Sequence, residues 1–254
     1  MGVTGWVRCR CFEQGLAVSP PGPVRVGEHD ELEASGADLR DWTRTGCRHP
    51  GMRVAELDLN WQAVRVLRGA LERCGDRDHF PVLLESIPQW TGSWWFTPAA
   101  AETALAEFDG FAERCGPVEV DRLLLDGADS GYQTARATPE WLATCPPGLV
   151  GLSGQGTFCV WSSTSVYEEP AFAAARVGQY VRLGVTNEVV LTDLDHGGTH
   201  RLTGPLLGTP DRPPPKRLEV RVVAVPAVEA YPAMPAFQRL LRAAVELDHH
   251  ALLG

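Results

Sequence analysis

Two short pairs of metal-binding side chains stand near the start of this 254-residue chain, in Cys9-Arg10-Cys11 and Cys47-Arg48-His49. Residues two apart on an extended segment point to the same side, so both members of a pair can reach one ion. Three thiolates and one imidazole complete a tetrahedral zinc shell and leave no open position for catalysis. The sequence therefore predicts a structural zinc ion with four protein ligands: Cys9, Cys11, Cys47 and His49.

The segment between the two pairs has little apolar material to fold around. It begins with a turn-rich run from Pro20 to Gly27 and continues with a cluster of acidic residues between Glu28 and Asp41. A metal ion would close this loop and stabilise a segment that cannot form its own core. The alternative is that Cys9 and Cys11 are small apolar residues at a sheet edge and that His49 lies in a surface loop.

The charge of the chain limits its partners. It has 32 acidic and 23 basic residues and a formal net charge of −9. Affinity for nucleic acid needs clustered Lys and Arg, so a nucleic-acid partner is not expected, whereas a basic protein suits the sign of the charge. No stretch approaches the ~18 apolar residues of a membrane span, and the first twelve residues lack a signal-peptide apolar run. We expect a cytoplasmic protein that does not bind membranes; its oligomeric state stays open.

Seven cysteines in a reducing compartment are expected to be thiols or metal ligands and not disulfides. Cys74 and Cys115 fall at the apolar ends of two predicted amphipathic helices, and Cys159 alternates with apolar residues in a predicted strand. These three are predicted to be core thiols. Cys145 is ambiguous, because a nucleophilic cysteine needs a base that the sequence does not identify.

Apolar spacings of three and four predict helices from Met52 to Cys74 and from Pro98 to Cys115, with a possible short helix between Phe80 and Ile87. A last helix is predicted from Pro235 to about His249. After Gly116 the pattern favours strands. They are predicted at Val118 to Leu125, Leu149 to Leu152, Thr157 to Trp161, Tyr180 to Leu183, Val189 to Leu194, His200 to Leu206 and Leu218 to Val225.

The predicted fold class is α+β. We expect a helical N-terminal half with a metal-tied, turn-rich first segment, followed by a mostly antiparallel β-sheet and a C-terminal helix. The predicted division is a zinc-stapled, mainly helical lobe at 1–116 and a β-rich lobe with the C-terminal helix at 117–254. One continuous domain is the alternative.

Two histidine-containing segments invite a functional interpretation, and each has a simpler one. Asp195-His196-Gly197-Gly198 lies between predicted strands, so a hairpin turn is favoured over an Asp/His metal site. A hairpin turn is also predicted at Gly154-Gln155-Gly156. His249-His250 is expected at the end of the last helix, where it would face the negative end of the helix dipole.

Three tryptophans lie within six residues: Trp90, Trp94 and Trp95. Such a cluster either packs over the helix pair or forms a binding face for a protein or a flat ligand. We predict them, together with the acidic stretch from Glu28 to Asp41, as candidate partner-binding or ligand-binding residues.

The chain has no P-loop, no G-x-G-x-x-G after a strand, no H-E-x-x-H and no G-x-S-x-G. In composition it resembles small bacterial binding proteins of the immunity or accessory kind, although this resemblance covers no motif. The predicted function is a non-enzymatic partner-binding protein with a structural zinc site. One alternative is a zinc-dependent hydrolase or lyase with an open coordination position and a base such as Glu13 or Glu56. A second is a small-molecule binding module with an apolar pocket.

Overall fold

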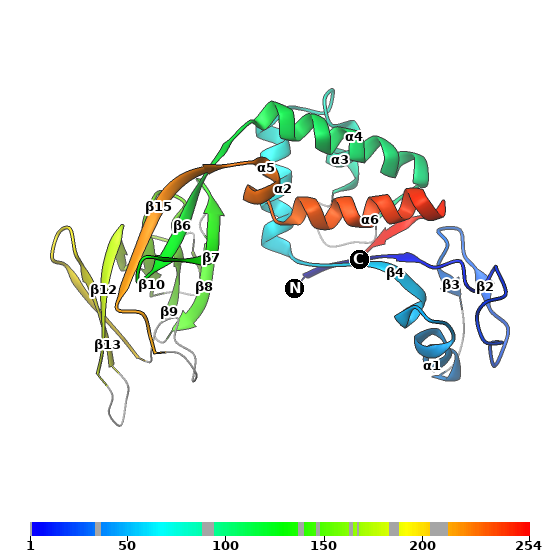
Figure 1. Ribbon diagram of the computed structural model, residues 1–254, viewed down its shortest axis with the longest axis horizontal. Coiled ribbons are helices and arrows are strands. Elements are labelled where there is room, and N and C mark those ends of the chain that lie inside the picture. The colour runs from blue at the N-terminus through cyan, green and yellow to red at the C-terminus, as the bar shows by residue number, and fades with distance from the viewer. Residues whose placement is uncertain are drawn as a thin grey trace. The chain divides into compact units, whose positions relative to one another are not determined.

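The computed structural model describes residues 2–33, 37–87, 94–136, 140–145, 148–162, 165–166, 168–182, 188–203 and 213–254. The chain forms two compact units: unit 1 comprises Met1–Gly116 and Tyr231–Gly254, and unit 2 comprises Pro117–Ala230. The C-terminal segment thus belongs with the N-terminal one, and Figure 1 shows the blue and red ends of the chain in the same unit.

The prediction of a helical N-terminal half followed by a sheet is wrong. Among the described residues, 38% lie in strands and 31% in helices, with four sheets and six short helices. Three strands of the N-terminal half join one from the C-terminus in an antiparallel sheet of order β4-β1-β16-β5. These strands are β1 (Gly2–Arg8), β4 (Arg53–Asn60), β5 (Trp94–Phe96) and β16 (Ala251–Leu253).

The helix predicted from Met52 to Cys74 is a strand followed by a helix. Residues 53–60 form β4, which pairs with β1 along its whole length. Helix α2 (Trp61–Cys74) begins only after Asn60. The Asn60 side chain caps the helix by accepting a hydrogen bond from the Ala63 amide at 2.6 Å. Over so short a stretch, the spacing of apolar residues such as Val54 and Leu57 fits both a strand and a helix. The apolar spacing alone therefore assigned this segment wrongly to a helix. The cap at Asn60 was the signal that marks the true start.

Helices pack on this sheet and on one another. They are α2, α3 (Pro81–Ser86), α4 (Pro98–Cys115) and α6 (Ala233–Leu247). The predicted helices α3, α4 and α6 are confirmed, and the Thr97 side chain caps α4 by accepting a hydrogen bond from the Ala100 amide at 3.1 Å. Their shared core includes fully buried aromatic and aliphatic side chains: Phe80, Phe108, Phe111, Phe237, Leu240 and Leu241.

Smaller elements complete unit 1 beside the sheet. They are a two-stranded ribbon of β2 (Arg25–Val26) and β3 (Leu32–Glu33), helix α1 (Ala37–Thr45) and the 3₁₀ turn η1 (Pro50–Met52). These elements belong to the turn-rich first segment. They flank the two predicted metal-ligand pairs.

The prediction that Cys74 and Cys115 are core thiols is wrong, because the two form a disulfide. Cys74 is the last residue of α2 and Cys115 the last of α4, so the bond joins the ends of the two helices. Each helix taken alone places its cysteine on an apolar face. The pairing depends on how α2 and α4 pack, which the apolar spacing does not reveal.

Unit 2 consists of two antiparallel sheets and one short helix, α5 (Ala227–Ala230). The sheet orders are β14-β13-β12-β15-β6-β7 and β11-β10-β9-β8. Apolar side chains of both sheets share one core. The strands are β6 (Val118–Leu125), β7 (Ala128–Ala135), β8 (Glu140–Cys145), β9 (Gly148–Leu152), β10 (Phe158–Trp161), β11 (Phe172–Ala174), β12 (Arg176–Arg182), β13 (Glu188–Asp193), β14 (Thr199–Thr203) and β15 (Arg217–Val225).

Both predicted hairpin turns in unit 2 are confirmed. Gly154-Gln155-Gly156 joins β9 to β10, with the Ser153 amide donating to the Thr157 carbonyl at 3.0 Å. In the second turn, the Asp193 carboxylate accepts hydrogen bonds from the backbone amides of Asp195 and His196 at 2.8 and 3.2 Å. Asp193 and His196 therefore serve the turn between β13 and β14. Cys159, predicted as a core thiol, is fully buried and free.

None of the helices in the described part of the chain has the length and the apolar character needed to cross a membrane.

Removing the disulfide should destabilise unit 1. The bond closes a loop with a sequence separation of 41, for which loop-closure entropy predicts a loss of about 3–4 kcal/mol in the free energy of unfolding. Urea unfolding of the Cys74→Ala/Cys115→Ala variant, compared with the native chain, measures it. If the disulfide forms, reduction should also increase the number of free thiols by two. An unchanged unfolding midpoint together with an unchanged thiol count would contradict the bond.

Candidate metal centre

The four predicted ligands come together in unit 1. Their ligand atoms all lie within 4.8 Å of one another. The Sγ atoms of Cys9 and Cys47 are 3.7 Å apart, and His49 Nδ1 lies 3.3 Å from Cys11 Sγ and 3.9 Å from Cys47 Sγ. A tetrahedral ion with Zn–S of about 2.3 Å and Zn–N of about 2.0–2.1 Å has S–S edges of about 3.8 Å and S–N edges of about 3.6 Å. The cluster can therefore hold a metal ion.

Backbone hydrogen bonds fix the first ligand pair at the end of β1. The Cys9 amide donates to the Met52 carbonyl at 2.8 Å, which joins this pair to the segment after the second one. The Cys11 carbonyl accepts hydrogen bonds from the amides of Leu16 and Ala17 at 2.8 and 3.0 Å, so the chain turns back directly after the pair. The first pair is thus held on both sides.

The second pair follows α1 and is ordered by its own turn. The His49 amide points at Cys47 Sγ at 3.4 Å, an interaction that strengthens when the sulfur is a thiolate. Gly46 comes directly before the pair, and a Cβ there would lie 2.7 Å from the Trp42 carbonyl oxygen and 2.8 Å from Met52 Cε. A glycine is therefore required for the close approach of α1 to the cluster.

A small apolar shell surrounds the cluster. Cys9, Cys11, Trp42 and Met52 are buried together, and the ring of Phe12 packs edge-on against that of Trp42 at 5.8 Å. Burial raises the pKa of the Cys9 thiol to about 12. A thiol in this environment keeps its proton at neutral pH unless a cation stabilises the thiolate. A divalent ion supplies that stabilisation and would turn this costly arrangement into a favourable one.

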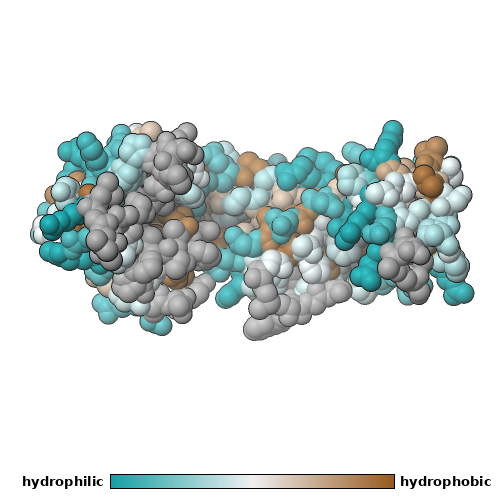
Figure 2. Space-filling model, turned by 90° about the horizontal axis from the view of Figure 1, so that it is seen from below, coloured by the Kyte–Doolittle hydropathy of each residue, from teal (hydrophilic) through white to brown (hydrophobic). Residues whose placement is uncertain are grey.

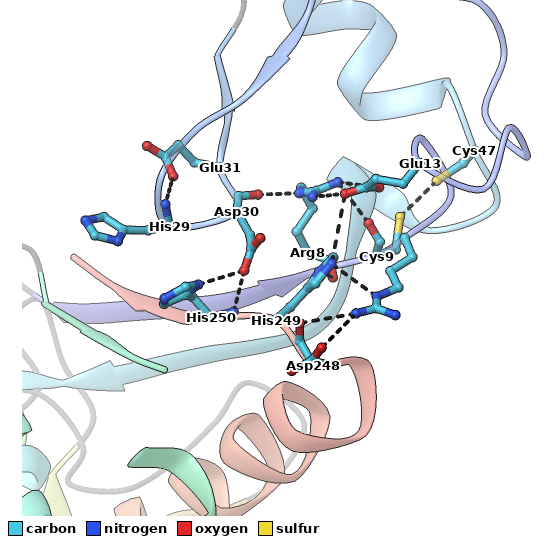
Figure 3. Close-up of polar contacts among 11 residues, drawn as sticks. Arg8, Cys9, Glu13, His29, Asp30, Glu31, Cys47, Asp248, His249 and His250 are labelled. Carbon is cyan, nitrogen blue, oxygen red and sulfur yellow. Dashed lines mark hydrogen bonds and ion pairs between the residues drawn. The ribbon is translucent and has the colours of Figure 1, made fainter. Parts of the chain in front are cut away.

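A polar network lies directly beside the cluster and ties it to the C-terminal residues (Figure 3). The guanidinium of Arg8, which is 5% exposed, pairs with the Glu13 carboxylate and with the Asp30 carbonyl. His249 Nδ1 lies 3.0 Å from the Arg8 carbonyl, and its Nε2 lies 3.3 Å from Arg10 Nε. The network therefore connects both flanks of Cys9 to the end of α6.

Glu13 does not fit the role of a general base. Burial alone would raise its pKa, but the hydrogen bonds and charge of Arg8 outweigh burial and lower the pKa below its ordinary value. Glu56, the other base considered, is exposed and pairs with Arg53 at 3.2 Å. A strongly paired carboxylate and an exposed one are both poor proton acceptors at neutral pH.

A second contact joins the β2–β3 ribbon to the C-terminus. The Asp30 carboxylate accepts a hydrogen bond from the His250 amide at 2.8 Å and lies 2.7 Å from His250 Nδ1 (Figure 3). Burial would raise the pKa of Asp30, but the hydrogen bonds from His250 outweigh it and lower the pKa. His249-His250 directly follows α6, which ends at Leu247, as expected, and its two imidazoles also contact the Arg8 carbonyl and the Asp30 carboxylate.

The tryptophans predicted as contact residues occupy different environments. Trp94 and Trp95 belong to β5 and pair with Leu253 and Leu252 of β16. Trp94 is half-buried, whereas Trp95 is 45% exposed and stacks on the His29 ring with centroids 3.9 Å apart. Trp90 lies outside the described residues. The acidic stretch is partly engaged inside unit 1, because Asp30 and Glu31 both accept hydrogen bonds there.

A cavity of about 340 Å³ adjoins the cluster. It borders three of the four ligands (Cys9, Cys11 and His49) and is closed on another side by α6. Arg10 and Arg48, each placed between the two ligands of its pair, also line it. The two-residue spacing predicted the Cys and His residues but not these arginines, whose only signal in the sequence is their position inside the two pairs.

No family model, curated protein or solved structure matches this chain. Function must therefore be inferred from the residues and their geometry.

Loss of the Asp30 charge should weaken the ribbon's attachment. At neutral pH, Asp30→Asn should lower the free energy of unfolding by about 1 kcal/mol, because one charge-assisted contact to His250 is lost. The pKa of Asp30 is lowered in the folded state, so its carboxylate stabilises the fold fully above the pKa of the unfolded chain, about 3.9. This stabilisation is lost as the pH falls through the pKa of the folded state.

The difference between the two proteins should therefore shrink from about pH 5 to about pH 3. Urea titrations of zinc-loaded samples, with the bound metal measured at each pH, distinguish the loss of this contact from acid release of the ion. A difference that stays constant over this range would contradict the pairing.

Proposed function

We propose that this chain is a non-enzymatic binding protein in which a zinc ion holds the N-terminal segment onto the sheet of unit 1. The observation that carries the proposal is the meeting of three sulfur atoms and one imidazole nitrogen within 4.8 Å. Four protein ligands fill a tetrahedral shell. Amide and carbonyl contacts on both pairs preorganise that shell, as expected for an ion that stabilises structure.

The proposed binding surface includes Trp95 and the neighbouring β5 edge. Among the residues whose side chains are described, Trp95 is the one tryptophan with a largely exposed side chain, and aromatic side chains of this kind frequently anchor protein partners. On the face drawn in Figure 2, the described hydrophobic residues form small separate patches in a largely hydrophilic surface. A net charge of −9 favours a basic partner.

We further propose bacterial origin and a cytoplasmic location, where thiols stay reduced for metal binding. The Cys74–Cys115 disulfide weighs against this location, because disulfides are rare in reducing compartments. Counting thiols in protein isolated under non-reducing conditions tests this proposal. Seven free thiols would favour a reducing, cytoplasmic location, and five would favour an oxidising one.

A second candidate function is a zinc-dependent hydrolase or lyase. The observation in its favour is the cavity that borders Cys9, Cys11 and His49. It would require displacement of one ligand to open a position for water. The pairing of Glu13 with Arg8 removes one base that this mechanism could use.

Loss of one ligand should release the first segment while leaving the helices folded. Cys47→Ser should reduce bound zinc from about one ion per chain to nearly none, because serine is a poor zinc ligand. Trypsin should then cut quickly after Arg25 and Arg44, which lie between the two ligand pairs, while the circular dichroism of the helices persists.

Cys159→Ser is the matched control, since this free thiol lies in unit 2 and should keep full metal content. Unchanged zinc content in Cys47→Ser would rule out the assignment of this ligand.

Trp95 should be dispensable for folding if it is a contact residue. Trp95→Ala should cost less than about 1 kcal/mol, since the side chain is 45% exposed and its described ring contact is the stack on His29. Phe96→Ala, at a fully buried neighbour in the same strand, should cost about 3–5 kcal/mol. Thermal melts compare the two, and equal losses would show that Trp95 is needed for the core.

A further inference from the structure

The cavity beside the metal cluster carries opposite charges that are not used within the protein. Arg48 and Glu246 both line it and are both exposed, and neither side chain forms a hydrogen bond or ion pair with another described residue. Arg48 comes from the second ligand pair and Glu246 from α6. A basic and an acidic side chain from two different elements thus line one small space.

The third charged wall is already fixed in position. Arg10 Nη2 donates to the Asp248 carbonyl at 3.3 Å, and Arg10 Nε lies 3.3 Å from His249 Nε2. These contacts hold the Arg10 side chain against the end of α6. Arg10 Nη2 also pairs with the Asp248 carboxylate at 3.5 Å, which offsets part of its charge. Arg10 is therefore a positioned hydrogen-bond donor in the cavity wall, and the unpaired positive charge comes from Arg48.

Apolar side chains form the rest of the rim. Leu16 is 66% exposed and Val54 is 38% exposed, and both line the cavity together with Leu247. Covering exposed apolar side chains such as these removes apolar area from water and is favourable. The cavity is therefore lined by basic, acidic and apolar residues.

The charges select the class of ligand. A phosphate or a simple fatty acid would meet Arg48 but would be repelled by Glu246, and a simple amine would have the opposite difficulty. A zwitterion satisfies both groups, with its carboxylate accepting from the arginines and its ammonium donating to Glu246. The volume of about 340 Å³ is at the small end of the range for ligand pockets, about 300–1,000 Å³, which suits a single amino acid.

We propose that this cavity binds a free α-amino acid with an apolar side chain, held between Arg48 and Glu246 and covered by Leu16 and Val54. This site goes beyond the proposed structural role of the ion. It requires the ion only to keep the wall formed by Cys9, Cys11 and His49 in place. A small-molecule site would thus be built onto the metal-tied segment.

Isothermal titration of zinc-loaded protein with three related probes tests the charge pattern. The probes are L-leucine, 4-methylpentanoate, which lacks the ammonium, and 3-methylbutylamine, which lacks the carboxylate. Leucine should bind at least about ten-fold more tightly than either analogue, since each lost charge-assisted hydrogen bond costs about a factor of ten or more. Equal binding of all three, or no binding of leucine at about 10 mM, would overturn the proposal.

Two variants assign the contacts. Arg48→Gln should reduce the advantage of leucine over the amine, leaving only what Arg10 contributes, and Glu246→Gln should remove its advantage over 4-methylpentanoate. Arg44→Gln and Glu113→Gln, at exposed charged residues that do not line the cavity, serve as matched controls and should leave binding unchanged. Full leucine affinity in Arg48→Gln would overturn the proposed orientation.

Zinc content, measured in the same samples, separates this inference from the proposed function. Absence of leucine binding by protein that holds one zinc ion would overturn the amino-acid site and leave the structural role of the ion intact. Absence of zinc would count against the structural role, whatever leucine does.

Discussion

The close approach of three thiols and one imidazole is the interaction on which the N-terminal part of unit 1 depends. The residues from Cys9 to Ala17 and from Trp42 to Met52 share only a small apolar cluster. Their backbones are joined by few hydrogen bonds, among them Cys9 to Met52 and Val18 to Gly46. A metal ion bound by both pairs would close the loop between them and replace the core that this segment lacks.

The same segment is also attached to the C-terminus. Strand β16 lies between β1 and β5, and the imidazoles of His249 and His250 contact the Arg8 carbonyl and the Asp30 carboxylate. Displacing the metal-binding loops would therefore also disturb the C-terminal residues. The cavity lined by Arg10, Arg48 and Glu246 lies where these parts of the chain meet, so its shape depends on the same contacts.

Local signals predicted part of this structure. The Thr97-Pro98 start and the Gly116 stop identified α4, and alternating apolar residues identified β6 and β15. The ligand residues were chosen for their chemistry and their two-residue spacing, and the fold brings all four together. In each case the relevant information lies within a few neighbouring residues.

Contacts between distant residues could not be predicted in this way. Leu57 and Val54 fit either period, and only the pairing with β1 makes their segment a strand. The disulfide joins residues 41 apart, and His250 lies 220 residues from Asp30. Residue type and spacing say nothing about which distant partner each of these side chains meets.

X-ray absorption at the zinc edge on the metal-loaded protein tests the central claim most directly. A closed structural site predicts three sulfur neighbours at about 2.3 Å and one nitrogen neighbour at about 2.0–2.1 Å, with no change when azide is added. Fewer than three sulfur neighbours, or an oxygen neighbour that azide displaces, would contradict the claim and favour an ion with an open catalytic position.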